Sequence, residues 1–142
     1  MTAAILDTNV LIRLVLDDNQ HQSNVAFDAL DSATSIIVPT LVFCEFVWVL
    51  RSIRTGAGEK KYSPKMIAES IRQFIEFDHV YIANDEVEAG LQMLEAGGDF
   101  ADGVIEYVGR KLARNATTTF FSFDKNAVNK LSKRGLSALL LQ

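Results

Sequence analysis

Short apolar segments that end at or just before an acidic residue constrain the fold of this chain more than any other feature. The segment Ala3–Leu6 is followed directly by Asp7, and the segment Thr117–Ser122 is followed two residues later by Asp124. A parallel strand that ends on an acid places that carboxylate at the carboxyl edge of the sheet, where open α/β sheets bind ligands. The pattern therefore predicts a group of acids on an α/β scaffold.

Hydrophobic periodicity predicts short strands that alternate with helices along the whole chain. Such alternation is typical of a parallel sheet covered on both faces, so we expect a three-layer α/β/α fold with a central sheet of roughly five strands. The predicted strands are Ala3–Leu6, Ser35–Val38, Val80–Ala83, Thr117–Ser122 and Leu139–Leu141. The predicted helices are Asn9–Leu16, Gln22–Leu30, Thr40–Arg54, Lys65–Phe77, Asp85–Glu95, Ala101–Arg114 and Lys125–Lys133.

The 142 residues, 49% hydrophobic and 23% charged, suit a single domain, residues 1–142, with a sizeable core. No apolar run approaches the roughly 20 residues that span a bilayer, and the first residues lack the basic segment of a signal peptide. We therefore expect a soluble, cytoplasmic protein. The single cysteine, Cys44, excludes an internal disulfide and a thiolate zinc site, and we expect it to be buried. His21 and His79 lie in polar settings and are expected at the surface, which disfavours catalysis by imidazole.

The net charge is −4, but it is unevenly distributed. From residue 103 onward seven Lys and Arg stand against two acids, whereas the earlier residues include seven basic and sixteen acidic side chains. A basic C-terminal third beside an acidic pocket is compatible with holding a phosphate backbone over a metal ion. Solvation of two outer helix faces explains the same pattern equally well.

Four of the acids have a structural explanation beside the functional one. Asp7 and Asp124 are placed where a side chain caps a helix or a turn. Asp99 is placed to cap the next helix, with Asp102 in its first turn complementing the helix dipole. One carboxylate can serve both purposes, so these alternatives stay open.

Glu45 lies within an apolar helical run, so we expect it to be buried and to need a partner or a metal ion. An ion pair with Arg51 or Arg54 is the alternative, although neither has the favourable three- or four-residue spacing. Asp and Glu ligands without His or Cys select Mg²⁺ or Mn²⁺ over zinc. Such an ion orients an attacking water and stabilises a leaving oxygen, which favours phosphodiester hydrolysis.

Four segments, in their order and spacing, resemble the PIN-domain family and, within it, the VapC-type toxins of type II toxin–antitoxin pairs. These segments are DTNVLIRL, PTLVFCEFVWVL, GGDFADGVIEYVGRK and TFFSFDKNA. The resemblance covers nearly the whole chain and implies an α/β/α fold with a parallel sheet. It implies a Mg²⁺- or Mn²⁺-dependent endoribonuclease, for which we expect products with a 5′-phosphate and a 3′-hydroxyl.

The resemblance also implies roles for individual residues. The metal-binding catalytic acids it implies are Asp7, Glu45, Asp102 and, more peripherally, Asp124. The accessory and supporting residues it implies are Asp99, Thr8, Asn9 and Ser122. The family usually has Ala after the third acid, whereas this chain has Gly103. Glycine there weakens the first turn of a helix by up to about 1 kcal/mol but removes no ligand.

The resemblance implies two protein partners. One is a second copy in a homodimer, and the other is a cognate antitoxin that threads a C-terminal segment through a groove and presents an Arg to the acids. Phe43, Phe46 and Trp48 would suit that groove, but aromatic residues of this kind belong more often to an ordinary core.

Other readings stay open at this stage. A catalytically inert PIN-like binding domain would be indifferent to metal, and a nucleotide-binding module would want a glycine-rich phosphate motif that is absent. An aspartate-nucleophile phosphatase using Asp7 would want a second acid two residues later, where this chain has Asn9. The polar segment Thr55–Ser63 could contact RNA through Lys60 and Lys61 or form a disordered loop.

Overall fold

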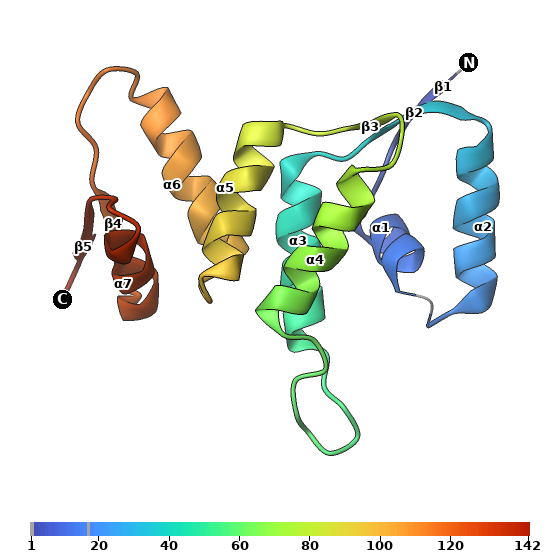
Figure 1. Cartoon of the computed structure of the whole chain (residues 1–142), viewed down its shortest axis with the longest axis horizontal. Helices are drawn as coiled ribbons and strands as arrows, with labels where there is room; N and C mark the ends of the chain where they lie inside the picture. Colours follow the sequence, from blue (N-terminus) through green and yellow to red (C-terminus); the bar gives the residue numbers. More distant parts are fainter. Residues whose placement is uncertain (1, 17) are drawn as a thin grey trace. The chain divides into compact units, whose positions relative to one another are not determined.

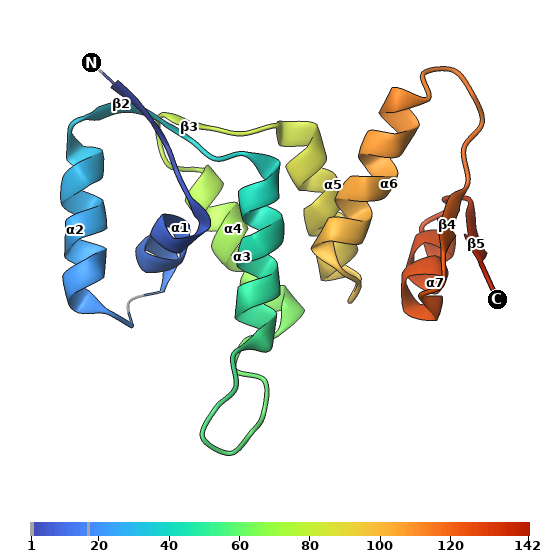
Figure 2. The same ribbon diagram turned by 180° about the vertical axis from the view of Figure 1, so that it is seen from behind.

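The computed structural model describes residues 2–16 and 18–142, which fall into two compact units, residues 1–83 and residues 84–142. We call them the N-terminal unit and the C-terminal unit. Each unit contains its own helices and parallel strands (Figures 1 and 2). The prediction that residues 1–142 form one domain stays a prediction.

The N-terminal unit is built on a three-stranded parallel sheet with the strand order β1-β2-β3. Ile5 pairs with Ile37, and Ile37 pairs in turn with Tyr81. The Leu6 amide donates to the carbonyl oxygen of Ile37 at 3.0 Å, which fixes the backbone up to Asp7. The elements are β1 (Thr2–Ile5), α1 (Thr8–Val15), α2 (Gln20–Asp31), β2 (Ala33–Ile37), α3 (Thr40–Ser52), α4 (Pro64–Ile75) and β3 (Val80–Tyr81).

Helix α3 supplies much of the core of this unit. Phe43 and Phe46 are completely buried, so the core alternative is correct for these two residues and the groove alternative is not. A helix advances about 100° per residue, which places Trp48 on the opposite side, where it is 75% exposed. Cys44 is half-buried rather than buried as predicted.

The segment between α3 and α4 folds into a small hairpin, which projects from the two helices in Figure 1. The backbones of Arg54 and Lys60 form an antiparallel β-bridge, and the Thr55 amide donates to the Glu59 carbonyl oxygen at 2.8 Å. Gly58 closes the turn with a φ of 83°, a left-handed conformation that glycine adopts without strain. The alternative of a disordered loop is therefore contradicted.

The C-terminal unit pairs two helices and adds a two-stranded parallel sheet with a helix against it. In that sheet Phe120 pairs with Ala138, and Ser122 pairs with Leu140. The elements are α5 (Asn84–Glu95), α6 (Phe100–Leu112), β4 (Phe120–Ser122), α7 (Lys125–Lys133) and β5 (Ala138–Leu140).

Two glycines allow α5 and α6 to approach closely. A Cβ atom on Gly103 would lie 2.5 Å from the Ala89 carbonyl oxygen and 2.6 Å from the Cβ atom of Met93. A Cβ atom on Gly90 would lie 2.6 Å from the ring of Phe100. Gly103 therefore permits the close contact between α5 and α6 that positions the start of α6. This contact explains why glycine is present there despite its low helix propensity.

The predicted elements are all present, with ends displaced by at most a few residues. The α/β class with parallel strands is confirmed, although the strands are short and occur as sheets of three and two. His21 and His79 are exposed, as predicted. Within residues 2–16 and 18–142, no helix has the length and apolar character needed to cross a membrane.

Candidate active site

Asp7 lies at the carboxyl end of β1 and caps α1. Its Oδ1 accepts a hydrogen bond from the backbone amide of Thr8 at 2.7 Å, and the side chain is exposed. The capping alternative is therefore correct, but it occupies one carboxylate oxygen. The second oxygen of Asp7 makes no hydrogen bond within the described residues, so the same side chain can also bind a ligand.

Thr8 and Asn9, the residues expected to support Asp7, have different environments. Thr8 is only 6% exposed, and its Oγ1 has no hydrogen-bond partner among the described residues. A buried hydroxyl without a partner costs about 1–3 kcal/mol, so this atom beside Asp7 calls for a further polar group. Asn9 is exposed and lies away from the core.

Glu45 is exposed, so the prediction of a buried carboxylate was wrong. The residues that pack inward from α3 lie on one face, and Glu45 lies on the other, with Leu41 and Trp48. Glu45 makes no ion pair with Arg51 or with any other described residue, which leaves its carboxylate available.

The sheet brings Asp7 and Glu45 to the same edge of the N-terminal unit. Parallel strands β1 and β2 lead into α1 and α3, so both helices begin at the carboxyl edge of the sheet, and they pack against each other. This edge is where open α/β sheets bind ligands. Asp7 directly follows β1 at this edge, and Glu45 lies in the second turn of α3.

The C-terminal unit contains the other three acids at two helix starts. Asp99 holds the N-cap position of α6 but makes no capping hydrogen bond, and Asp102 follows in the first turn. Asp124 caps α7, accepting hydrogen bonds from the amides of Asn126 at 2.9 Å and Ala127 at 3.3 Å. The capping alternative is thus correct for Asp124 and wrong for the side chain of Asp99.

Ser122 orients the backbone before Asp124. Its Oγ accepts a hydrogen bond from the Asp124 amide at 2.9 Å. The serine therefore fixes the turn between β4 and α7, in which Asp124 is the capping residue. The hydrogen bond joins Ser122 to the backbone of Asp124 rather than to its carboxylate, and the supporting role of Ser122 in a catalytic site stays a prediction.

The three acids of the C-terminal unit interact electrostatically. Burial, followed by the negative charges of Asp99 and Asp124, together raise the pKa of the Asp102 carboxyl from 3.8 to about 6. Like charges near a half-buried carboxylate disfavour its ionised form. A cation bound to Asp102 would remove this penalty.

The predicted site residues fit a hard divalent cation by their chemistry. The ligand set consists of carboxylates only, the donors preferred by Mg²⁺ and Mn²⁺. Within either unit, the described residues contain no group of three or more Asp, Glu, His or Cys side chains placed to hold a metal ion. The raised pKa of Asp102 and the Thr8 Oγ1, which has no partner among the described residues, are compatible with a bound cation near these acids.

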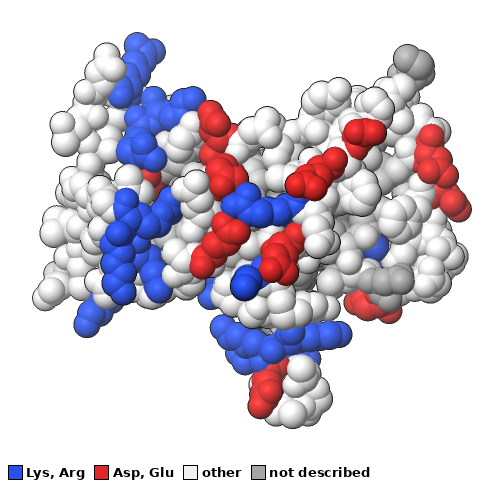
Figure 3. All heavy atoms as spheres, viewed as in Figure 1, with Lys and Arg blue, Asp and Glu red and all other residues white. Residues whose placement is uncertain are grey.

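Most basic residues of the C-terminal unit lie on α6 and α7, where Figure 3 shows Lys and Arg at the surface. Arg110 differs because it holds the buried carboxylate of Glu106, with Nε 2.9 and 2.8 Å from its two oxygens. Sequence reasoning did not single out this pair, although its four-residue spacing is the signal that could have found it. Lys111 and Lys133 remain exposed, so the solvated-face alternative holds for part of this charge.

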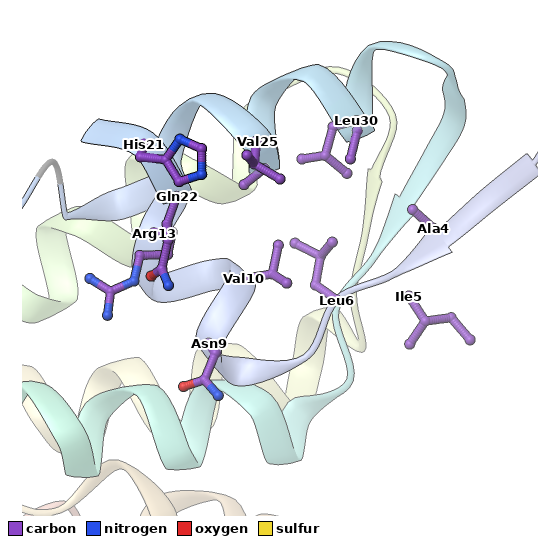
Figure 4. A pocket seen from close by; sticks show the side chains of 12 residues that line it. Ala4, Ile5, Leu6, Asn9, Val10, Arg13, His21, Gln22, Val25 and Leu30 are labelled. Carbon is purple, nitrogen blue, oxygen red and sulfur yellow. The ribbon is translucent and has the colours of Figure 1, made fainter. Parts of the chain in front are cut away.

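A cavity of about 780 Å³ opens in the N-terminal unit between β1, α1 and α2 (Figure 4). Its wall along α2 includes Val25 and Leu30, while Arg13 and His21 give one end a polar character. Arg13 is paired with Asp18 at 2.6 Å. The cavity lining includes Asn9 but none of the predicted catalytic acids, so it is separate from the carboxylates.

Comparison with known proteins identifies the fold family. A family model described as PIN domain matches residues 4–131, a range that contains all the predicted site residues. A comparison with curated proteins gave no match. PIN domains are generally nucleases and typically use divalent metal ions. Since the match covers most of the sequence, the chain belongs to the PIN-domain family and has a nuclease fold.

Proposed function

We propose that this protein is a Mg²⁺- or Mn²⁺-dependent endoribonuclease that hydrolyses RNA phosphodiester bonds. The observation that carries the proposal is the raised pKa of Asp102 in a PIN domain, which results first from burial and then from repulsion by Asp99 and Asp124. Asp99 makes no capping hydrogen bond at the start of α6. A capping role therefore does not explain why its negative charge lies near Asp102. Carboxylates held together against their own repulsion are typical of cation sites.

The proposed ligands are Asp7, Glu45, Asp102 and Asp124. A divalent ion, when bound, supplies an acidified water and stabilises the charge that develops on the phosphate. The backbone amides that hold Asp7 and Asp124 fix one oxygen of each carboxylate and leave the other for the ligand. Glu45 is exposed and has no competing partner in the described part of the chain.

Asp102 is the acid most sensitive to occupancy of the proposed site. With a pKa of about 6 it carries a proton for part of the time near neutral pH, and cation binding displaces that proton. Asp99 raises the negative charge around Asp102 and acts as the accessory residue. Ser122 supports the turn before α7 by accepting a hydrogen bond from the Asp124 amide. Thr8 is the proposed supporting residue beside Asp7.

As a biological role, we propose a VapC-type toxin that forms homodimers and is neutralised by a cognate antitoxin. This proposal is supported by the order and spacing of the four motif segments along the chain. The apolar cavity beside α2 in Figure 4 supports a peptide-binding role for that helix, since Val25 is 55% exposed there. The groove proposed for the antitoxin no longer includes Phe43 or Phe46, which are buried.

The test incubates purified wild type and Asp7→Asn with total cellular RNA, with and without Mg²⁺ or Mn²⁺, and maps the fragment ends. We expect discrete, metal-dependent cuts with 5′-phosphate and 3′-hydroxyl ends that the variant does not make. Asp28→Asn, an exposed acid on α2, is the matched control and should cut like wild type. Ends carrying a 2′,3′-cyclic phosphate would contradict the mechanism, because they require attack by the 2′-hydroxyl. Absence of cutting by folded, metal-loaded wild type would favour an inert binding domain.

A further inference from the structure

The exposed face of α3 carries an aromatic residue one turn from a proposed catalytic acid. Trp48 is the single tryptophan of the chain and is 75% exposed. It follows Glu45 by three residues, so the two side chains share a face and are separated by roughly 4.5 Å along the helix axis. Leu41, 68% exposed, extends the same face by one turn in the other direction.

The hairpin beyond the end of α3 is basic. Arg54, Lys60 and Lys61 are all exposed, and Glu59 is the acid between them. These cations lie on a segment held by backbone interactions. Arg54 and Lys60 are paired in an antiparallel β-bridge, and the Lys61 amide donates to the Ile53 carbonyl oxygen at 3.1 Å. Figure 3 shows Lys and Arg gathered on this projection.

We propose that Trp48 and the basic hairpin bind the single strand of RNA that leads away from the cleaved bond. A nucleobase stacks on the Trp48 indole, and Arg54, Lys60 and Lys61 contact the following phosphates. This inference rests on the proposed function, because Glu45 marks the cleavage site. It defines the substrate class as unpaired RNA, since a base must be unstacked to lie on an aromatic side chain.

Charge complementarity argues for RNA over an apolar protein partner on this face. Stacking platforms flanked by cations are the usual construction of proteins that bind single strands, because every base has a π-face and every nucleotide a phosphate. The buried face of α3 already fills the core, so Trp48 is not needed for packing. An exposed tryptophan without such a role would leave a large apolar surface in water.

Fluorescence of the single tryptophan reports on this face directly. Asp7→Asn, which should leave the RNA uncut, is titrated with a 12-nucleotide oligouridylate and with a blunt RNA duplex. We expect saturable quenching by the single strand that weakens as salt is added, and little quenching by the duplex. Equal quenching by both, or none by the single strand, overturns the proposal. Trp48 emission that instead depends on protein concentration and ignores RNA would assign the face to a protein partner and also overturn it.

Variants of Trp48 and of the basic hairpin test the two contacts separately. The Kd for RNA is measured by fluorescence anisotropy of a labelled oligouridylate. Trp48→Ala in the Asp7→Asn background should raise Kd roughly ten-fold, with recovery in Trp48→Phe. Phe27→Ala, an exposed aromatic residue on α2, is the control and should leave Kd unchanged. Replacing Lys60 and Lys61 together by Ala should lower the slope of log Kd against log salt by roughly 1.4.

The outcomes separate this inference from the proposed function. Metal-dependent cutting by wild type together with unchanged binding by Trp48→Ala would overturn the role of Trp48 and leave the nuclease intact. Binding that depends on Trp48 without any cutting by wild type would support the RNA contact and contradict the nuclease. In the active protein, we expect Trp48→Ala to raise KM more than it lowers kcat, because stacking of a base outside the cleaved bond contributes equally to binding of the ground state and the transition state.

Discussion

The acids of the two units stand in contrasting environments. In the N-terminal unit Asp7 and Glu45 are exposed, and among residues 2–16 and 18–142 their side chains make one hydrogen bond, to the Thr8 amide. In the C-terminal unit Asp99 and Asp124 add their charge to the burial of Asp102 and raise its pKa to about 6. The second arrangement disfavours the ionised form of Asp102. The C-terminal acids are therefore the stronger sign of selection for a ligand.

The largest expected effect is the loss of cleavage when an acid of either unit becomes an amide. We expect Asp7→Asn and Asp102→Asn each to lower the single-turnover rate on a defined RNA by roughly 10³-fold, because each removes a proposed metal ligand. Asp99→Asn should lower it by only about 10-fold, as an accessory residue does. A large loss from Asp102→Asn with none from Asp7→Asn would restrict the site to the C-terminal unit.

The second prediction concerns the close contact that positions the C-terminal acids. Gly103→Ala should destabilise the protein by about 2 kcal/mol in chemical denaturation, because its Cβ atom would meet the Ala89 carbonyl oxygen. Gly109→Ala, on the same helix with no atom within 4 Å of the added Cβ, should instead stabilise it by up to about 1 kcal/mol. Equal gains in stability from both substitutions would show that the contact between α5 and α6 can accept an added methyl group at residue 103.

The third prediction follows from the pKa of Asp102, which is raised from 3.8 to about 6 in the folded protein. The folded state then binds more protons than the unfolded state between these values, so stability falls as pH rises from about 4 to 6. Asp102→Asn should be more stable than metal-free wild type by about 1 kcal/mol above pH 6.5, and equally stable below pH 4. Added Mg²⁺ should close the gap at neutral pH. A pH-independent difference would contradict the electrostatic account.

The smallest expected effect is at Thr8. Thr8→Val keeps the shape and removes the unpartnered Oγ1, so the metal-free protein should be as stable as wild type or gain up to about 1 kcal/mol. Cleavage should fall all the same if this hydroxyl supports Asp7 when the site is filled. A loss of stability of more than about 1 kcal/mol would show that the hydroxyl has a partner in solution.

Local patterns in the sequence predicted the elements well, because strand and helix periodicities depend on neighbouring residues alone. The placement of Asp7 at a strand end followed from the same patterns. Burial was harder to predict on α3, where apolar residues surround the helix and only the packing against α1 and α4 selects one face. Glu45 was therefore predicted to be buried and is exposed, while the choice between core and groove stayed open for Phe43, which is buried, and for Trp48, which is exposed.

Features that depend on long-range contacts could not be read from spacing. The need for Gly103 arises from the backbone of Ala89 on another helix. The raised pKa of Asp102 arises partly from Asp124, which lies 22 residues further along the chain. The hairpin around Gly58 is held by backbone hydrogen bonds that its polar sequence does not reveal.

Calorimetric titration with Mn²⁺ tests the central claim, that these acids form a cation site, most directly. At pH 6.5, in two buffers of different ionisation enthalpy, wild type should bind Mn²⁺ saturably and release a fraction of a proton, because Asp102 is partly protonated. Asp102→Asn should bind much more weakly and release no proton, while Asp28→Asn should match wild type. Saturable binding that is the same in Asp102→Asn, or no binding by folded wild type, would contradict the account.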